Sequence, residues 1–257
     1  MRVHLINLDE SEDRLAEFKE RNRQLTDVIR FPAIVGRKVS PEKLVRAGVM
    51  SRDIPPYGKG AIGNALSHLS LWKLAIDQSA VVTIAEDDAV FHHTFEAKAE
   101  AHLRSLPEAW DIVLWGWNFD SVLLFDFLEG VSPCVGRFSQ PQLRLHLKEY
   151  QSLAIQSRLY PLQIAFGIMA YSVSPAGALK LAEHCLPIRK MDVFCPGLNR
   201  AVTNSTIDIM MNALYPKINS YVCFPPLAVT SNDKDRSTVV PTKPDVNSEL
   251  FTEVAQV

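Results

Sequence analysis

The chain has 257 residues, a length typical of one sizeable domain that buries its own core. Hydrophobic residues make up 47% and charged residues 22%, the composition of an ordinary soluble globular protein. Because 27 basic and 29 acidic residues leave a net charge of −2, the broad basic field of a duplex nucleic-acid binder is absent, and we expect no nucleic-acid partner.

The cysteines and the apolar runs bear on the compartment. The four cysteines lie far apart and form no CxxC pair, which argues against a zinc or thioredoxin-type site. We interpret them as buried free thiols in a reducing compartment, with disulfides as the alternative. The first apolar run is too short for a signal peptide, and no run reaches the roughly 18 apolar residues of a transmembrane span. We therefore expect a cytoplasmic protein. Peripheral contact with the inner face of a membrane and the oligomeric state stay open.

The first 116 residues alternate between strand and helix patterns. Apolar runs predict strands over residues 3–8, 28–35, 80–85 and 110–116. Amphipathic patterns predict helices that begin at Ser11 and Pro41 and helices over residues 61–78 and 95–106. This alternation is typical of an α/β fold with a Rossmann-like, mostly parallel central sheet flanked by helices.

The second half of the chain has a weaker pattern. Residues 117–160 contain short apolar segments broken by glycine and proline, which we interpret as hairpins or an insertion. Further on, we expect a strand over 164–173, a helix from Ser174 to about Cys185, a loop over 187–204, a helix over 206–214 and a strand over 218–224. Polar residues dominate from Ser231, so residues 231–257 are predicted to form a mobile tail.

Three consecutive acids, Glu86, Asp87 and Asp88, follow the apolar run of residues 80–85. Ligands of open α/β sheets bind outside the carboxyl ends of the strands, where these acids are expected to lie. Side chains alternate along an extended chain, so Glu86 and Asp88 should point one way and Asp87 the other. Two carboxylates on one side suit a hard cation such as Mg²⁺ or Mn²⁺. The alternative is a solvated acidic turn.

The predicted helix before the acids contains GAIGNALSHLSLW at residues 60–72. Gly60 and Gly63 permit close approach of another backbone segment. Ser67 and His68 are polar residues beside the apolar stripe of this helix. For His68, the alternative to a functional role is a core histidine that satisfies its own hydrogen bonds.

Three sequence blocks, LINLDESEDRL, GAIGNALSHLSLW and TIAEDDAVF, resemble in order and spacing the N-terminal blocks of glycosyltransferase family 25. That family includes bacterial lipopolysaccharide and lipooligosaccharide galactosyltransferases and the collagen galactosyltransferases. FPAIVG, FGIMAYSVSPAGALKL and the pair Ile207–Asp208 extend the resemblance to roughly residues 3–230. The chain departs from the family pattern at Ala61, where an acid is usual, and at Asn64, where cysteine is usual.

The resemblance implies a GT-A-like fold in a single domain. That domain would cover residues 1–230, with a donor-binding part at about 1–116 and an acceptor-side part at about 117–230. It implies an inverting transfer of a sugar, typically galactose, from a UDP-sugar to a glycan or glycolipid acceptor, as in lipopolysaccharide or surface polysaccharide synthesis. The Glu-Asp-Asp block is similar to the DxD motif of GT-A enzymes. Asp88 would then bind Mn²⁺ or Mg²⁺, Glu86 would hold ribose or donor sugar, and Asp87 would orient the turn or help with the metal.

Further residues of the donor site follow from the same resemblance. Asn7, Leu8 and Arg14 resemble the nucleotide end of the site, and a surface ion pair with a nearby helix acid is the alternative for Arg14. Ser67 and His68 would line the donor pocket or brace the acidic turn from behind, and bracing is favoured for Ser67.

An inverting transfer needs one general base. Asp208 matches the apolar–Asp pair of the family and Asp192 lies in the preceding loop; a helix-terminal acid and a solvated loop acid are the alternatives. GT-A enzymes often supply another metal ligand near the C-terminus, usually histidine. Because no histidine follows position 184, Asp233 or Asp235 is expected to substitute. Aromatic residues that could stack on acceptor sugars, or belong to the core, are Trp117, Phe119, Phe127 and Phe194.

Two other functions stay open from the sequence. A metal-dependent nucleotidyltransferase or phosphohydrolase could use the same acidic strand end, although the sequence contains no GxxxxGK phosphate loop. The other alternative is a non-catalytic relative that binds sugar nucleotides. The departures from the family pattern at Ala61 and Asn64 favour this alternative.

Overall fold

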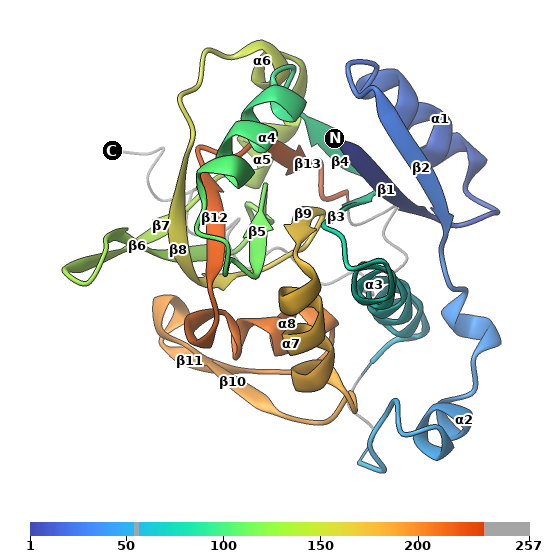
Figure 1. Ribbon diagram of the computed structural model, residues 1–257. Coiled ribbons are helices and arrows are strands. Elements are labelled where there is room, and N and C mark those ends of the chain that lie inside the picture. Colours follow the sequence, from blue (N-terminus) through green and yellow to red (C-terminus); the bar gives the residue numbers. More distant parts are fainter. Residues whose placement is uncertain (54–56, 234–257) are drawn as a thin grey trace.

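A nine-stranded sheet runs through the middle of the molecule (Figure 1). The structure is a computed structural model that describes residues 1–53 and 57–233. In spatial order the strands are β2 (Asp27–Pro32), β1 (Arg2–Asn7), β3 (Val82–Glu86), β9 (Ala170–Val173), β5 (Ile112–Leu114), β12 (Ser220–Phe224), β8 (Arg158–Ala165), β6 (Val122–Leu128) and β7 (Ser132–Arg137).

The sheet is mixed, so the expectation of a mostly parallel sheet does not hold. β1 pairs in parallel with β2 and β3, and β5 pairs in parallel with β12. The other five neighbouring pairs are antiparallel. Two of these five pairs involve β9, which comes from the second half of the chain and lies antiparallel between β3 and β5, and the other three join β12, β8, β6 and β7. The strand–helix alternation of the first 116 residues contains no trace of β9.

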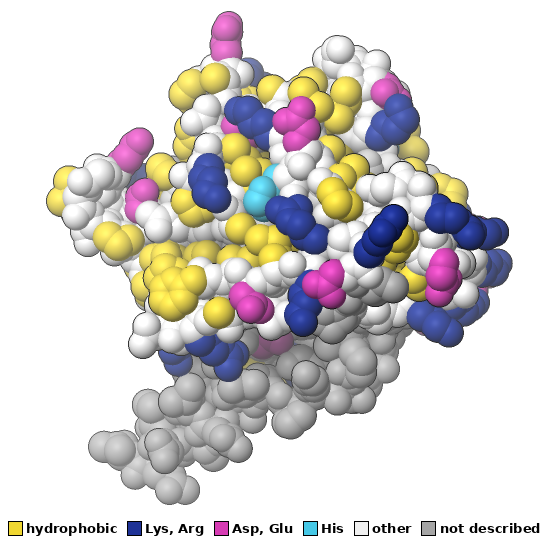
Figure 2. Space-filling view, turned by 90° about the horizontal axis from the view of Figure 1, so that it is seen from below, with side chains coloured by type: hydrophobic (Ala, Val, Ile, Leu, Met, Phe, Trp, Pro, Cys, Tyr) yellow, Lys and Arg dark blue, Asp and Glu magenta, His cyan; other side chains and the backbone are white. Residues whose placement is uncertain are grey.

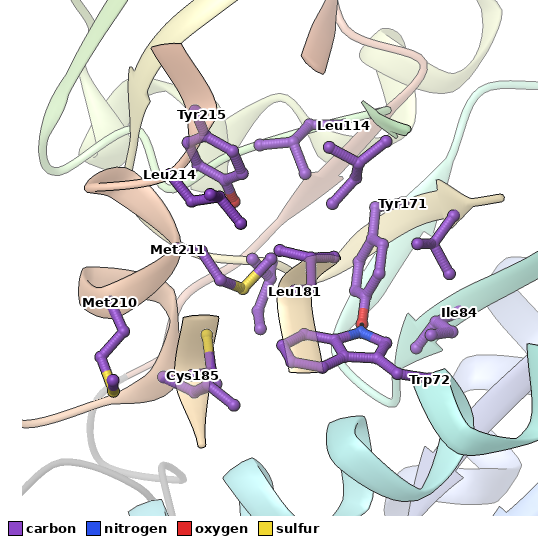
Figure 3. Close-up of a cluster of buried hydrophobic side chains, with 14 of the residues drawn as sticks. Trp72, Ile84, Leu114, Tyr171, Leu181, Cys185, Met210, Met211, Leu214 and Tyr215 are labelled. Carbon is purple, nitrogen blue, oxygen red and sulfur yellow. Dashed lines mark hydrogen bonds between the residues drawn. The ribbon is translucent and has the colours of Figure 1, made fainter. Parts of the chain in front are cut away.

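Helices cover both faces of the sheet, which confirms the α/β class (Figure 1). One face carries α3 (Lys59–Gln78), α7 (Pro175–Cys185) and α8 (Ile207–Asn212), and the other carries α1 (Glu12–Arg21) and α4 (Phe95–Ser105). Side chains alternate between the two cores along β5, where Ile112 and Leu114 join the first and Val113 the second. Figure 3 shows part of the first core, in which Trp72 of α3 and Tyr171 of β9 meet.

Several smaller elements complete the described structure. They are α2 (Pro41–Arg46), α5 (Gln140–Leu145), α6 (Leu147–Ser152), the short helices η1 (Gly36–Lys38), η2 (Pro196–Leu198) and η3 (Tyr215–Lys217), and the strands β4 (Ala89–Phe91), β10 (Asp192–Cys195), β11 (Arg200–Thr203) and β13 (Ala228–Thr230). The hairpin predicted within 117–160 exists as β6–β7. The loop predicted over 187–204 instead contains the hairpin β10–β11.

The single strand predicted over residues 164–173 is divided into β8 and β9. The break falls at Gly167, whose φ of 83° lies in the left-handed region and is incompatible with a continuous strand. The predicted start of α7 is confirmed, since Ser174 Oγ accepts a hydrogen bond of 3.0 Å from the Gly177 amide. Ser11 also occupies the N-cap position of α1, but its side chain makes no capping hydrogen bond there.

Other expectations concern cysteines, membrane spans and the tail. All four cysteines are free thiols, and three of them are buried as predicted, whereas Cys134 is only half-buried. In the residues that the structure describes, no helix has the length and apolar character needed to cross a membrane. The predicted mobile tail lies outside the described residues from position 234 onward.

Candidate functional site

The turn after β3 separates two cavities. The first, here called the acidic cavity, has a volume of about 190 Å³ and is lined by the predicted site residues Arg14, Glu86, Asp87, Asp88, Asp208 and Asp233. The second, the strand-end cavity, has a volume of about 330 Å³ and is lined by the predicted residues Asn7, Leu8, Arg14, Ser67, Glu86 and Asp87. Because both cavities share Arg14, Asn64, Glu86 and Asp87, they lie next to each other.

The three carboxylates of the turn bind three different parts of the fold. Glu86 Oε1 accepts a hydrogen bond of 2.8 Å from Asn64 on α3. Asp87 accepts one of 2.7 Å from Asn7 at the end of β1 and forms an ion pair with Arg14 of α1. Asp88 Oδ2 accepts one of 2.7 Å from the Thr230 hydroxyl at the end of β13. The expected alternation fails because residues 87–88 form a turn, where the chain is no longer extended.

Asp88 is the one of the three with a buried oxygen that lacks a partner. Its Oδ1 atom is buried and makes no hydrogen bond within the described residues. Burial raises the pKa of Asp88 to about 6, and the neighbouring charge of Glu86 adds to the shift, while Thr230 opposes it. A buried carboxylate oxygen without a donor is costly unless a proton or a cation completes it. This observation fits a hard divalent cation at Asp88.

The protein supplies only part of a metal coordination shell. Among residues 1–53 and 57–233, no three His, Cys, Asp or Glu side chains are grouped so that they could hold a metal ion. Mg²⁺-type cations commonly bind through one or two carboxylates together with substrate phosphates and water. The residues present therefore fit a cation that is held jointly with a bound diphosphate, and they do not fit a metal site made of protein ligands alone.

His68 braces the acidic turn from behind. Its ring is fully buried, with Nε2 3.1 Å from Glu86 Oε1 and Nδ1 2.8 Å from the Tyr171 hydroxyl. Tyr171 also accepts a hydrogen bond of 2.7 Å from Trp72 Nε1, and Figure 3 shows these two side chains in contact. The hydrogen bonds of this network are satisfied if Tyr171 donates to Nδ1 and Nε2 donates to Glu86. Although burial opposes ionisation of Glu86, the hydrogen bonds from His68 and Asn64 prevail and lower its pKa.

Ser67 lines the strand-end cavity, in keeping with one of its two predicted roles, but it makes no hydrogen bond to the acidic turn, the role that was favoured for it. Its hydroxyl accepts a hydrogen bond of 2.9 Å from the Ile34 amide and donates one of 2.8 Å to the Gly63 carbonyl, so it fastens residues 33–36 to α3. A Cβ at Gly63 would lie 2.3 Å from the Ile34 carbonyl oxygen, which confirms that glycine permits this close backbone packing. Ser67 therefore shapes the strand-end cavity, and the bracing expected of it belongs to His68.

Asp208 reaches the acidic cavity from the first turn of α8. Its Oδ2 accepts a hydrogen bond of 2.9 Å from the Gly167 amide in the loop between β8 and β9, and its Oδ1 makes none within the described residues. A Cβ at Gly167 would lie 2.3 Å from Asn118 Oδ1, so a larger residue there would have to displace the Asn118 side chain as well as adopt an unfavourable positive φ. Asp208 is thus a half-buried carboxylate anchored by one oxygen.

The structure separates the remaining candidates. Asp192 is exposed at the start of β10, accepts a hydrogen bond of 2.7 Å from Thr203 Oγ1, and lines neither of the two cavities. Asp233 lines the acidic cavity, and Asp235 lies outside the described residues. Of the four aromatic candidates, Trp117 is fully buried, Phe119 is half-buried, and Phe127 and Phe194 are 52% and 59% exposed.

Several residues of the acidic cavity were missed by sequence reasoning. Asn118 and Thr206 line the cavity, and Thr230 binds Asp88. These are common polar residues in segments without a distinctive pattern, so nothing in the sequence marks them. Gly167 carried a usable signal, since an isolated glycine in a strand pattern indicates a bulge or close approach.

The model of the family described as Glycosyltransferase family 25 (LPS biosynthesis protein) matches residues 1–195. The chain belongs to glycosyltransferase family 25. The matched range contains the acidic turn, the strand-end cavity and Gly167, whereas Asp208, Thr230 and Asp233 follow it.

Insect relatives agree with this assignment. A Glycosyltransferase 25 family member of Drosophila melanogaster is 28% identical over 217 residues, which are 76% of this chain and 30% of that protein. One of Aedes aegypti is 31% identical over 126 residues, which are 44% of this chain and 21% of that protein. The family 25 chain thus spans less than a third of the length of these relatives. The crystal structure of A197 from STIV covers 95% of both chains at 11% identity, but its TM-score of 0.36 is too low to support an argument.

Proposed function

We propose that this family 25 chain is an inverting, metal-dependent glycosyltransferase. It moves a sugar, with galactose as the expected one, from a UDP-sugar to a hydroxyl of a glycan or glycolipid acceptor in the synthesis of lipopolysaccharide or another surface polysaccharide. One observation carries the proposal: the unpartnered, buried oxygen of Asp88 and the anchored carboxylate of Asp208 line the same cavity.

The strand-end cavity is suited to the nucleoside of the donor. It combines apolar side chains and backbone at residues 33–36 with the polar ends of Asn7 and Ser67, the mixture typical of small-molecule pockets. Its junction with the acidic cavity runs past Arg14 and Asp87, so a nucleoside bound there would direct its diphosphate toward Asp88. The ion pair with Asp87 holds the Arg14 guanidinium at this junction. In this position the guanidinium would bind a phosphate group of the donor.

Asp88 would hold a Mn²⁺ or Mg²⁺ ion together with the phosphate oxygens, and Asp233 is the described acid that lines the same cavity. When bound, the cation supplies Lewis-acid stabilisation of the negative charge on the departing diphosphate. Contacts of Glu86 and Asp87 with the rest of the fold hold the acidic turn in place. Asn64 and His68 of α3 both bind Glu86 Oε1, which leaves Oε2 to accept a hydrogen bond from the donor.

Asp208 is the proposed general base. The acceptor hydroxyl oxygen forms a bond to the anomeric carbon while the bond to the UDP oxygen breaks, and the hydroxyl proton goes to Asp208. The Gly167 amide holds one carboxylate oxygen of Asp208, which leaves the other to accept the proton. Attack from the side opposite the leaving UDP inverts the anomeric configuration.

Two variants separate donor binding from chemistry. With UDP and Mn²⁺ at about 100 times Kd, the melting temperature should rise by roughly 5–10 °C above that of the protein with either alone. Asp88→Ala should abolish this rise. Asp208→Asn should keep it, because asparagine can still accept the Gly167 hydrogen bond, and should lower UDP release with UDP-galactose and acceptor by about 10²- to 10⁴-fold.

Asp77→Asn, an exposed change on α3, is the matched control and should behave as wild type. A metal-independent UDP shift, or an unchanged shift in Asp88→Ala, would refute the assignment of Asp88. Release of pyrophosphate or phosphate in place of UDP would favour the nucleotidyltransferase or phosphohydrolase alternative.

A further inference from the structure

A third cavity, of about 300 Å³, lies between the hairpin β10–β11 and the sheet. We call it the hairpin cavity. It is lined by residues from β6, β8, β10, α8 and η3, and its polar and aromatic members are Gln163, Asp192, Phe194, Asn212 and Lys217. The lower face of the molecule, where β10 and β11 lie, mixes apolar side chains with charges of both signs (Figure 2).

Phe194 gives this cavity a distinctive surface. Its side chain is 59% exposed, and no other aromatic ring of the described residues packs against it. Asp192, one oxygen of which accepts a hydrogen bond from Thr203, and Lys217 line the same cavity. A pyranose ring has an apolar C–H face and a rim of hydroxyl groups. An open aromatic face next to hydrogen-bonding side chains complements both parts of such a ring.

The hairpin cavity and the acidic cavity are neighbours along α8. Asp208 lines one and Asn212 lines the other, four residues apart on the same side of the helix, a rise of about 6 Å. Both side chains bind the chain at the end of β8, Asp208 through the Gly167 amide and Asn212 through the Ala165 amide at 2.8 Å. The two cavities therefore adjoin the same helix about one turn apart, so a sugar bound in the hairpin cavity would lie beside the helix that carries Asp208.

We propose that the hairpin cavity is an acceptor subsite for a neutral sugar unit of the saccharide whose hydroxyl is presented to Asp208. This rests on the proposed transferase function. Phe194 stacks on the sugar ring, and Asp192 and Lys217 bind its hydroxyl groups. Their opposite charges offset each other, which suits a neutral sugar and disfavours an acidic one. Asp192 thus serves acceptor recognition, and the general base is Asp208.

The test uses the full chain on a printed array of neutral oligosaccharides built from galactose, glucose and N-acetylhexosamines, followed by titration of the best binder. Phe194→Ala should weaken that binding by about tenfold or more. Phe194→Trp should restore it, because a tryptophan ring can also stack on the sugar. Phe127→Ala is the matched control: that ring is 52% exposed on β6, lies outside the three cavities and should be neutral.

The UDP–Mn²⁺ melting shift, measured on the same samples, reports folding and the donor site independently. If Phe194→Ala binds the oligosaccharide as well as wild type does, the subsite is refuted while the donor site stands. A wild-type chain that shows the UDP–Mn²⁺ shift but binds no neutral oligosaccharide on the array would also overturn the subsite. Loss of the UDP–Mn²⁺ shift in wild type would instead count against the transferase function itself.

Discussion

The three adjacent acids of the turn differ in what surrounds them. Glu86 and Asp87 each accept a hydrogen bond from an asparagine and face a histidine or an arginine. Asp88 receives one hydroxyl and keeps a buried oxygen without a donor. Burial also raises the pKa of Asp87, but Arg14 and Asn7 offset part of that shift. The environment therefore leaves Asp88 as the acid whose negative charge is least compensated by the protein.

This difference predicts how Asp88→Asn alters the stability of the metal-free protein. The pKa of Asp88 is about 6 in the folded chain and 3.8 in its ordinary state, so between these values the folded state holds a proton that the unfolded state has released. Stability therefore falls as the pH rises through this window, by at most about 3 kcal/mol. The asparagine side chain of the variant cannot ionise, so thermal denaturation in EDTA should show the variant more stable by several degrees at pH 7.5.

At pH 4, close to the ordinary pKa, most of that advantage should disappear. The stability advantage of the variant disappears because burial destabilises only the ionised form of Asp88, and this form is scarce in the folded state below about pH 6. Asparagine can still accept the hydrogen bond from Thr230, so the comparison leaves that contact intact. An equal gain at both pH values would show that the buried carboxylate is not the source of the effect.

At the scale of elements, close backbone packing explains why two sequence blocks occur together. The FPAIVG segment lies directly on the first turns of α3, where Gly36 and Gly63 leave no room for a Cβ and Ser67 binds Ile34. A Cβ at Gly36 would lie 1.8 Å from the Lys59 carbonyl oxygen. The two blocks form one wall of the strand-end cavity, so their residues are constrained together.

The loop between β8 and β9 gives the element-scale prediction. Gly167→Ala should destabilise the chain by roughly 2–4 kcal/mol, since alanine would adopt a φ of 83° and its Cβ would clash with Asn118. The shifted loop would displace the amide that holds Asp208, and transfer should fall more than UDP–Mn²⁺ binding does. Urea denaturation and kinetic assays measure both effects.

Gly130→Ala is the control for this change. Gly130 also has a positive φ, 69°, but a Cβ there would have nothing within 4 Å, so only the conformational cost of roughly 1 kcal/mol should appear. Equal destabilisation by the two substitutions would mean that the contact with Asn118 plays no part.

Local patterns were sufficient for most elements and failed where long-range contacts decide. The helix over 61–78, the cap at Ser174 and the strand over 80–85 were predicted within a few residues. The hairpin β10–β11 was missed. Its segments alternate little in polarity and five of their eight residues are exposed, so no period of two stands out. Strand pairing, in contrast to helix formation, depends on a partner that the local sequence does not identify.

For the whole molecule, the segment after β13 connects distant parts of the chain at the acidic cavity. Thr230 binds Asp88, and Gln140 of α5 donates hydrogen bonds of 2.9 Å and 3.1 Å to the carbonyls of Thr230 and Ser231. Arg144 of α5 donates bonds of 2.7 Å and 2.6 Å to the carbonyls of Ser231 and Asn232. Helix α5 thus holds the segment that leads to Asp233 against the cavity.

Arg144→Ala should therefore weaken UDP–Mn²⁺ binding by roughly fivefold, since losing exposed hydrogen bonds from a charged group costs about 1 kcal/mol. The melting temperature without ligand should change by no more than a few degrees, because Arg144 lies at the surface. Titration calorimetry measures the affinity, with Arg104→Ala on α4 as an exposed control away from the site. An unchanged affinity would mean that the hydrogen bonds from Arg144 do not contribute to UDP–Mn²⁺ binding.

The sequence by itself determined the family resemblance, the α/β class and the presence of an acidic strand end, because each is carried by contiguous residues or by their periodicity. Only the tertiary structure decided that Asp88 lacks a partner, that Asp208 joins it in one cavity and that Asp192 lies in another. These facts depend on contacts such as Thr230 with Asp88, 142 positions apart, whose geometry local chain preferences cannot specify.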